Sequence, residues 1–366
     1  MPQDKETPAI TSLGENIDTP TKTDIVLDTD DQEDVSSQGF VLRDRLLRPR
    51  TLISFGLAFG LILFVFRGID IDPAETFQQM RQANPWLYLL AFATFYSTFP
   101  VRALRWRLLL RNANFPIQQG SRSWASIPAL TEYLGLSWFV NCVVPAKLGD
   151  AYRGYLLKRN GNVSFSRSVG TIFAERLLDM IVLFALLVFS GWQVFGAQLP
   201  PATRYIFLLG LLLVVLIIIG LTAMRFLSPL IRRAVPQRLE RVYGSFEEGT
   251  LGSLRPRALP LLFGLTTLIW MAESLRLLFV IEAMGGLNLS LSAIMFVALT
   301  SSLLTTVPAT PGGLGLVEGG IIGVLISPLF AVAKTTAGAA AILDRVINYW
   351  SIIVFGLILF LLSKRK

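Results

Sequence analysis

The stretch VVPAKLGDAYRG, residues 143–154, interrupts a long apolar region with a proline, two glycines and three charged side chains. Proline ends helices because it lacks a backbone N–H and its ring clashes with the preceding turn. Residues 306–320, TVPATPGGLGLVEGG, place the same Val-Pro breaker and several glycines in a second apolar region. Inside a membrane, irregular backbone must be buried in protein or line a cavity. The two stretches therefore predict two broken helices in a membrane protein.

The rest of the chain has the composition of an integral membrane protein. Hydrophobic residues make up 53% of its 366 residues, and the mean hydropathy is +0.57. Several uncharged windows, of which 205–224 is the strongest, are long enough to cross a hydrocarbon core of about 30 Å. The sequence predicts an all-α integral membrane protein.

The residue inventory excludes several kinds of site. The chain has no histidine and one cysteine, Cys142, which excludes histidine-based metal sites, Ser-His-Asp triads and internal disulfides. No GxxxxGK[ST] motif is present, which argues against ATP-driven transport by this chain alone. We expect no cofactor and no metal. We also expect no nucleic-acid partner, because the basic residues lie in loops between the apolar segments.

The N-terminal segment differs from the rest of the chain. Residues 1–40 carry ten acidic residues against Lys5 and Lys22, with few aromatic residues, which is typical of a disordered segment. The basic and apolar regions of a signal peptide are missing. We predict an acidic, disordered cytoplasmic tail over 1–40 and a polytopic membrane domain over 41–366.

Arginine-rich loops predict the orientation, because Lys and Arg concentrate on the cytoplasmic side of short loops. They place both termini in the cytoplasm and an amphipathic interfacial helix within 225–257. Each of the apolar stretches 123–160 and 290–333 has both of its flanking loops on the same side of the membrane and so cannot cross it once. We interpret the two stretches as re-entrant hairpins that open in opposite directions. About six full spans are expected besides, at about 51–66, 85–104, 168–195, 205–224, 258–283 and 337–362.

The order span, hairpin, span occurs twice, over about 85–195 and 258–363. Opposite orientations of these two halves predict an inverted repeat, the architecture of secondary transporters with a site near the midplane. Chance similarity between apolar sequences is the alternative. The similar segments are RALRWRLLL at 102–110 with SLRLLF at 274–279, and AERLLD at 174–179 with AILDRVINYW at 341–350.

Ionisable side chains within the apolar segments are the candidate site residues. Each costs about 2.5–3.5 kcal/mol on insertion scales, so such residues face a cavity or a partner. Glu175 and Asp179 share one helix face, and Glu273 and Arg276 are spaced to pair. Ion pairs that only hold the helices together are the structural alternative. The candidate substrate-binding residues are Lys147, Gly149, Asp150, Arg153, Glu175, Arg176, Asp179, Arg276, Pro311, Gly312, Gly313, Gly315, Glu318, Asp344 and Arg345.

The two breakers favour an anionic substrate. The helices that follow them begin with free N–H groups, which suit an anion. Lys147 and Arg153 add positive charge near the first breaker, and the planar fork of arginine matches phosphate. We expect Arg153 to attract a lipid phosphate. An ordinary loop at Pro311–Gly313 is the alternative.

The motifs VVPAKLGDAYRGYLL at 143–157, FAERLLD at 173–179 and VPATPGGLGLVEGG at 307–320 resemble the flippase-like, lysylphosphatidylglycerol synthase transmembrane-region family. The resemblance covers about 45–363. It implies translocation of an aminoacylated phospholipid or a polyprenyl-phosphate-linked glycan across the cytoplasmic membrane. In full-length synthases a soluble aminoacyltransferase domain follows, and we do not expect that activity in a chain ending at Lys366.

We therefore expect a flippase of the cytoplasmic membrane that takes an anionic lipid and is not itself an enzyme, since no paired aspartates mark a surface loop. The alternative is a membrane-embedded enzyme or subunit that acts on a lipid phosphate in cell-envelope synthesis, with Asp150, Glu175 or Glu318 as base. A scaffold for envelope-glycan or lipid-modifying enzymes is a third hypothesis.

Overall fold

The computed structural model describes most of the membrane domain. The acidic tail predicted over 1–40, the start of the first expected span, and the breaker residues 145–146 and 307–309 lie outside the described residues. The described residues are 71–117, 123–144, 147–196, 201–228, 236–305 and 310–366, with scattered positions between 56 and 69.

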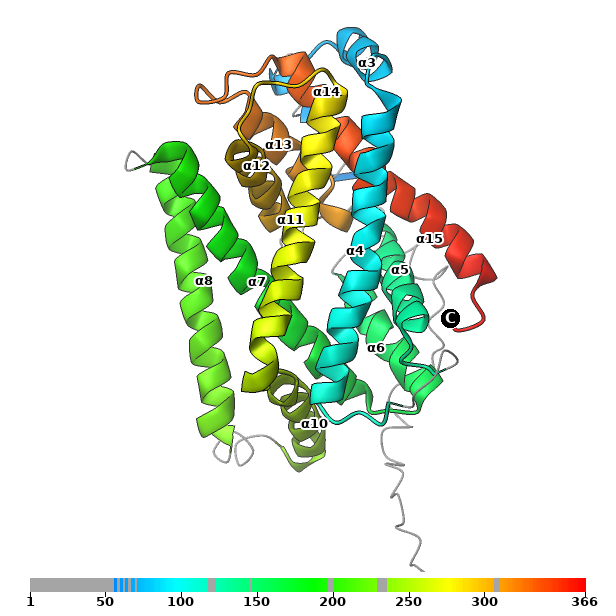
Figure 1. The fold of residues 1–366 in the computed structure, drawn as a ribbon. Helices are drawn as coiled ribbons and strands as arrows, with labels where there is room; N and C mark the ends of the chain where they lie inside the picture. Colours follow the sequence, from blue (N-terminus) through cyan, green and yellow to red (C-terminus); the bar gives the residue numbers. More distant parts are fainter. Residues whose placement is uncertain are drawn as a thin grey trace, which may run out of the picture. The chain divides into compact units, whose positions relative to one another are not determined.

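Throughout these residues the regular structure is helical (Figure 1), as the sequence predicts. Within the part of the chain that the structure describes, three segments are long and apolar enough to cross a membrane: Pro85–Asn112, Pro256–Ala283 and Lys334–Leu362. The α-helices are α3 (Pro73–Arg81), α4 (Pro85–Asn112), α5 (Ile127–Val143), α6 (Leu148–Gly161), α7 (Phe165–Phe195), α8 (Pro201–Phe226), α10 (Gln237–Ser253), α11 (Leu259–Ala283), α12 (Leu291–Leu304), α13 (Leu316–Leu325), α14 (Lys334–Arg345) and α15 (Ser351–Leu362).

Helices α4 and α11 lie side by side and run in opposite directions (Figure 1). The N–H of Asn84, which caps α4, donates to the carbonyl of Ala283 at the end of α11 over 2.7 Å. At the other end, the side chain of Asn112 donates to the carbonyl of Ser253, shortly before α11 begins. Helix α4 continues past residue 104, where the span was expected to end, so Arg102 and Arg105 lie within the helix.

The two broken segments form short helices that fold back on one another. Helix α6 packs on α5, and the side chains of Ser137 and Asn141 each make a 2.8 Å hydrogen bond to the backbone of Gly149. A Cβ atom on Gly149 would lie 2.0 Å from the carbonyl oxygen of Ser137, so the helices meet this closely only because residue 149 is glycine. Helices α12 and α13 pair in the same way through buried residues such as Val297 and Ile321. Their re-entrant placement in a membrane stays a prediction.

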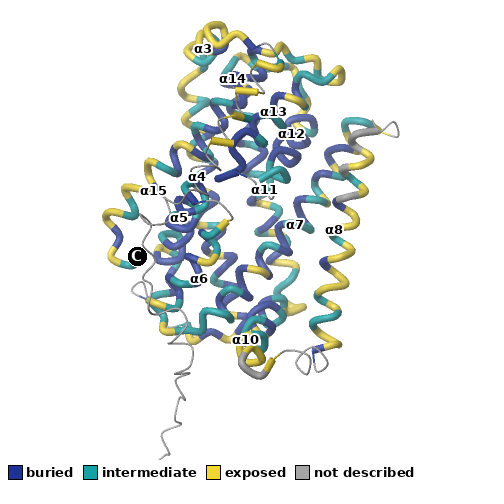
Figure 2. The backbone as a smooth tube through the Cα atoms, turned by 180° about the vertical axis from the view of Figure 1, so that it is seen from behind, coloured by how far each residue is buried: buried dark blue, intermediate teal, exposed yellow. Residues whose placement is uncertain are grey.

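Burial separates an inner from an outer set of helices (Figure 2). Helices α5, α12 and α13 are largely buried, whereas α8 exposes apolar side chains such as Leu208 and Ile219, which are 62% and 57% exposed. Helix α15 likewise exposes Leu361 and Leu362. Apolar surface of this extent marks an interaction with membrane or protein.

Helix α10 falls within the segment for which an amphipathic interfacial helix was predicted. It packs on α7, where the hydroxyl of Thr250 donates to the carbonyl of Gly170 over 3.3 Å and that of Ser166 to the carbonyl of Val242 over 2.6 Å.

Candidate functional site

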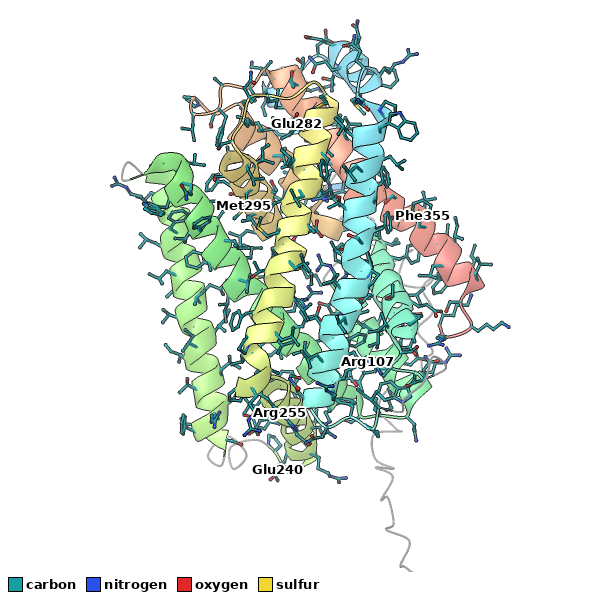
Figure 3. All side chains as sticks on the ribbon, in the orientation of Figure 1. Arg107, Glu240, Arg255, Glu282, Met295 and Phe355 are labelled. Atoms are coloured by element: carbon teal, nitrogen blue, oxygen red, sulfur yellow. The ribbon has the colours of Figure 1, made fainter. Side chains whose placement is uncertain are left out.

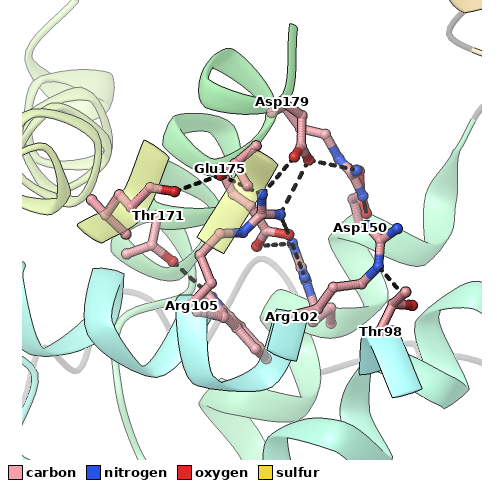
Figure 4. Close-up of polar contacts among 12 residues, drawn as sticks. Thr98, Arg102, Arg105, Asp150, Thr171, Glu175 and Asp179 are labelled. Atoms are coloured by element: carbon pink, nitrogen blue, oxygen red, sulfur yellow. Dashed lines mark hydrogen bonds and ion pairs between the residues drawn. The ribbon is translucent and has the colours of Figure 1, made fainter. Parts of the chain in front are cut away.

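Arg105 is the centre of a buried ion network in the first half of the domain. Its guanidinium lies 2.9 Å from Glu175 and 2.6 Å from Asp179, both on α7 (Figure 4), and it donates to Thr266 over 2.9 Å. The arginine is fully buried. Buried charges are tolerated only when they are paired and hydrogen-bonded. Glu175 and Asp179 share one helix face as predicted, and that face is turned toward α4.

A second buried network joins the two halves. Arg276 lies 3.2 Å from Glu273 on its own helix, α11, as predicted from their spacing, and 2.7 Å from Asp344 on α14. Arg102 of α4 reaches the other oxygen of Glu273 over 2.8 Å. Charged groups of α4, α11 and α14 therefore form one connected cluster.

The two short helices that follow the breakers carry an equivalent ion pair. Asp150 is the third residue of α6 and accepts two hydrogen bonds from Arg176, of 2.9 and 2.8 Å. Glu318 is the third residue of α13 and accepts a 2.9 Å hydrogen bond from Arg345. The residues before both helices, Lys147 and Gly315, have positive φ angles of 53° and 83°, which is uncommon for the non-glycine residue Lys147.

Arg345 also fixes the second breaker. Its guanidinium donates to the carbonyl of Gly312 over 2.9 Å, and Glu318 accepts from the N–H of Gly315 over 2.7 Å. Gly312 has a positive φ of 57°, and a Cβ there would lie 2.5 Å from the ring of Tyr349. One arginine thus holds both the irregular backbone and the helix that follows it.

A central cavity of about 200 Å³ lies between the two halves. Residues of both broken segments line this cavity, among them Lys147 from the first and Gly312 from the second. Cationic side chains outnumber anionic ones, and the remaining wall combines aromatic, hydroxyl and amide groups with aliphatic residues such as Leu277 and Ile321. Its polar and aromatic lining comprises Arg102, Lys147, Arg176, Arg276 and Arg345; Asp179, Glu273 and Asp344; Trp138, Trp270 and Tyr349; and Asn141, Ser301, Ser302, Thr305, Thr310 and Asn348.

The predicted site residues divide into two groups. The first group lines the central cavity: Lys147, Arg176, Asp179, Arg276, Gly312, Gly313, Asp344 and Arg345. The second group is not part of the lining: Gly149, Asp150, Arg153, Glu175, Pro311, Gly315 and Glu318. Several members of the second group hold members of the first, as Asp150 holds Arg176 and Glu318 holds Arg345.

Arg153 is placed differently from the expectation that it meets an incoming phosphate. It is fully buried, lies 3.1 Å from Glu175, and its guanidinium carbon is 4.5 Å from the ring centroid of Trp106. It follows Asp150 by three residues on α6, and packing turns it toward α4 and α7. Near the first breaker the cavity wall instead presents Lys147 and Arg176.

Arg102 is the cavity residue that the sequence analysis missed. It was assigned to the last turn of a span that ends near a basic loop, but α4 runs on for another two turns and Arg102 is 4% exposed. Its guanidinium carbon lies 5.0 Å from the ring of Trp138. The similarity between 102–110 and 274–279 did not point to it, because Arg276 corresponds there to Arg105.

Comparison with known sequences assigns the chain to a family. Residues 51–356 match the lysylphosphatidylglycerol synthase TM region. The chain belongs to this family. It is 38% identical over 228 residues to a UPF0104 membrane protein of Methanocaldococcus jannaschii, covering 62% of this chain and 95% of that protein. A UPF0104 membrane protein of Pyrococcus horikoshii is 25% identical over 352 residues, covering 87% of this chain and 98% of that protein.

A further similarity corrects one expectation. This family member is 27% identical over 145 residues to glycosyltransferase AglD of Haloferax volcanii, covering 40% of the chain and 22% of that enzyme. The expectation that the chain is not an enzyme is contradicted by this partial similarity, which points to an enzyme-related function. That expectation rested on the missing surface aspartates, and the absence of one kind of catalytic cluster does not exclude other enzyme-related roles.

Proposed function

We propose that the protein binds the anionic, phosphate-bearing headgroup of a lipid in the central cavity and moves it across the cytoplasmic membrane. The observation that carries the proposal is the set of cationic side chains, Arg102, Lys147, Arg176, Arg276 and Arg345, on the wall of one cavity between two halves of a membrane domain. Arginine binds phosphate oxygens in pairs through its planar fork.

The electrostatics of the cavity support this substrate class. Taking a charged headgroup out of water is the main barrier to lipid crossing, because an isolated charge in a low-dielectric medium is very unfavourable. Cationic groups already in place on the cavity wall stabilise the charge of an entering phosphate. The indole N–H of Trp270, on the same wall, is buried without a hydrogen-bond partner in the described structure, and it can only donate. An acceptor-rich headgroup suits this wall.

The arrangement of the halves supports transport. Helices α4 and α11, which begin the two predicted repeats, are antiparallel, and each repeat supplies the same kind of acid–arginine pair after its breaker. Inverted repeats with broken helices at their interface are the architecture of secondary transporters. The exposed apolar surface of α8 and α15 would contact the acyl or prenyl chains while the headgroup crosses.

The charge distribution supports cytoplasmic termini. Arg107 and Arg255 lie at one end of the domain, and Glu282 lies at the opposite end (Figure 3). The side chain of Asn160, in the last turn of α6, donates to the carbonyl of Arg365 over 2.9 Å, so the basic C-terminus lies beside the end of α6. Lys and Arg concentrate on the cytoplasmic side of membrane proteins.

Reconstitution tests the proposal. Purified protein in liposomes should move fluorescent phosphatidylglycerol or a polyprenyl phosphate between leaflets faster than protein-free liposomes, and should move phosphatidylcholine little. Arg276→Gln should slow movement of the anionic lipids, whereas Arg257→Gln, at an exposed position, is the matched control. If the wild-type protein moves neither anionic lipid, lipid transport by this chain alone is excluded.

The similarity to glycosyltransferase AglD favours a second candidate, an enzyme or enzyme subunit that acts on a lipid phosphate. The three acids considered as bases, Asp150, Glu175 and Glu318, are each ion-paired to arginine. Incubation of the protein with nucleotide sugars and a polyprenyl phosphate, followed by mass spectrometry of the lipids, tests this candidate. A glycosylated lipid would support it, and its absence would count against it. Lipid-modifying or envelope-glycan enzymes are the partners proposed in either case.

A further inference from the structure

The equivalent ion pairs of the two halves differ in their solvent exposure. In the first pair, the side chains of Arg176 and Asp150 are 33% and 20% exposed. In the second pair, those of Arg345 and Glu318 are 6% and 7% exposed. The ion pairs at two corresponding places in the sequence are therefore partly exposed in one half and buried in the other.

The bonding of the two arginines explains the difference. Arg345 uses its guanidinium on Glu318, on the carbonyl of Gly312 and on Asn348, with distances of 2.9, 2.9 and 3.2 Å. Arg176 directs its hydrogen bonds at Asp150 alone and otherwise lies 3.6 Å from Asp179. Arg176 therefore keeps exposed surface on the cavity wall, whereas the guanidinium of Arg345 is occupied by three partners.

Lys147 adds an available cation beside the open pair. Its side chain is exposed, lines the cavity, and has no hydrogen-bond or ion-pair partner within the described part of the chain. Lys147 immediately precedes α6, three residues before Asp150. An anion that reaches Arg176 therefore meets a second positive group at the same breaker.

We infer that Arg176 and Arg345 are the two phosphate-binding residues of the cavity and that a lipid phosphate binds them in turn. The inference rests on the proposed function and names its binding residues. In the conformation described, the phosphate takes the place of Asp150 on Arg176, with Lys147 as a second ligand. In the opposite conformation, the phosphate takes the place of Glu318 on Arg345.

The exchange of partners has a physical advantage. Breaking a buried ion pair is costly because it leaves a charge without compensation. When a phosphate replaces Asp150, Arg176 stays paired, and the displaced carboxylate is still within the influence of the positive charges of Arg153 and Lys147. The released carboxylate lies near the start of its short helix, so α6 or α13 is free to move from the long helix that held it. Headgroup binding and the opening of one broken helix are then one event.

Lipid binding measured by native mass spectrometry separates the two arginines. Phosphatidylglycerol and a polyprenyl phosphate are the probes, phosphatidylcholine is the comparison with a zwitterionic headgroup of zero net charge, and Arg257→Gln is the control. Arg176→Gln should weaken binding of both anionic lipids by about tenfold, equivalent to ~1.4 kcal/mol. Asp150→Asn should strengthen it, because the arginine is then available. Arg345→Gln should bind as the wild type does but move neither lipid in liposomes.

The outcomes decide the inference and the proposed function separately. Equal losses of binding in Arg176→Gln and Arg345→Gln, or no loss in Arg176→Gln, overturn the inference. If the wild type binds the anionic lipids but moves none, the proposed transport is overturned, and the binding comparison alone decides the inference. If Arg345→Gln does not fold, the exchanged pair Glu318→Arg with Arg345→Glu replaces it. Wild-type binding by this variant supports the inference, and a tenfold loss of the kind given above contradicts it.

Discussion

Arg276 on α11 lies 2.7 Å from Asp344 on α14, and this pair occupies the place in the second half that Arg105 and Glu175 occupy in the first. In each half the arginine comes from the first long helix, and the acid comes from the helix after the hairpin. In the sequence, Glu175 is followed directly by Arg176 and Asp344 by Arg345, and these two arginines bind the short helices α6 and α13. Both halves therefore use one order of charges to join a long helix, a short helix and the helix that follows the short one.

The first prediction concerns Arg105. Arg105→Ala leaves Glu175 and Asp179 buried without their main partner, and breaking a buried pair costs about 3–5 kcal/mol. Thermal unfolding in detergent, followed by fluorescence-detected size exclusion, should show a strongly lowered midpoint. Arg257→Ala, an exposed arginine, should unfold like the wild type. Equal midpoints for the two variants would mean that Arg105 does not hold the helices together.

Gly149 provides a steric test of the first hairpin. Gly149→Ala brings a Cβ to 2.0 Å from the Ser137 carbonyl, so α6 must move away from α5. We expect a less stable protein and loss of transport. Gly264→Ala is the matched control, because nothing lies within 4 Å of its Cβ and alanine favours a helix by ~1 kcal/mol over glycine. A stable, active Gly149→Ala variant would show that this close contact is not formed.

The positions of the helix breaks follow from the sequence because proline and glycine act locally. Residues 148–160 were expected to form the return arm of the first hairpin, and α6 covers Leu148–Gly161. The last span was expected at 337–362, and α14 and α15 together extend from Lys334 to Leu362. These boundaries depend on nearest neighbours in the chain.

The partners of the buried charges do not follow from the sequence in the same way. Arg153 and Arg176 were assigned alike, yet only Arg176 reaches the cavity, because the rotation of α6 and α7 is fixed by packing against other helices. Arg102 was missed because an arginine near a basic loop resembles a cytoplasmic residue, and only the partner Glu273 on α11 reveals its buried position. Such pairings join residues far apart in the chain.

The topology prediction uses single cysteines in a Cys142→Ser background. Cysteines at 111, 160 and 365 should react with a membrane-impermeant maleimide from the cytoplasmic side, and one at 287 from the outside. The hydrogen bond between Asn160 and the Arg365 carbonyl already places two of these positions together. Labelling of 111 and 160 from opposite sides would exclude the re-entrant hairpin and, with it, the inverted repeat.

The last prediction separates the charge of Arg345 from its geometry. Arg345 contacts Glu318, the carbonyl of Gly312 and Asn348 with three different nitrogens of one planar group. Lysine keeps the charge but has a single nitrogen on a flexible stem, so Arg345→Lys cannot hold the three groups in the same arrangement. We expect the second breaker to loosen while the domain stays folded, since the charge of Glu318 is still compensated.

A cysteine at Thr310, which is 4% exposed, reports on this loosening in the Cys142→Ser background. It should react with maleimide at least several times faster in Arg345→Lys than with Arg345 intact. Arg365→Lys is the control, because Arg365 lies 3.5 Å from Glu132 near the C-terminus, away from the cavity lining. Unchanged reactivity in Arg345→Lys would mean that packing of α13 against α12, and not the arginine, fixes the breaker. In that case Arg345 would be free to leave Gly312 without opening the cavity, and its engaged state would not explain why the second pair is closed.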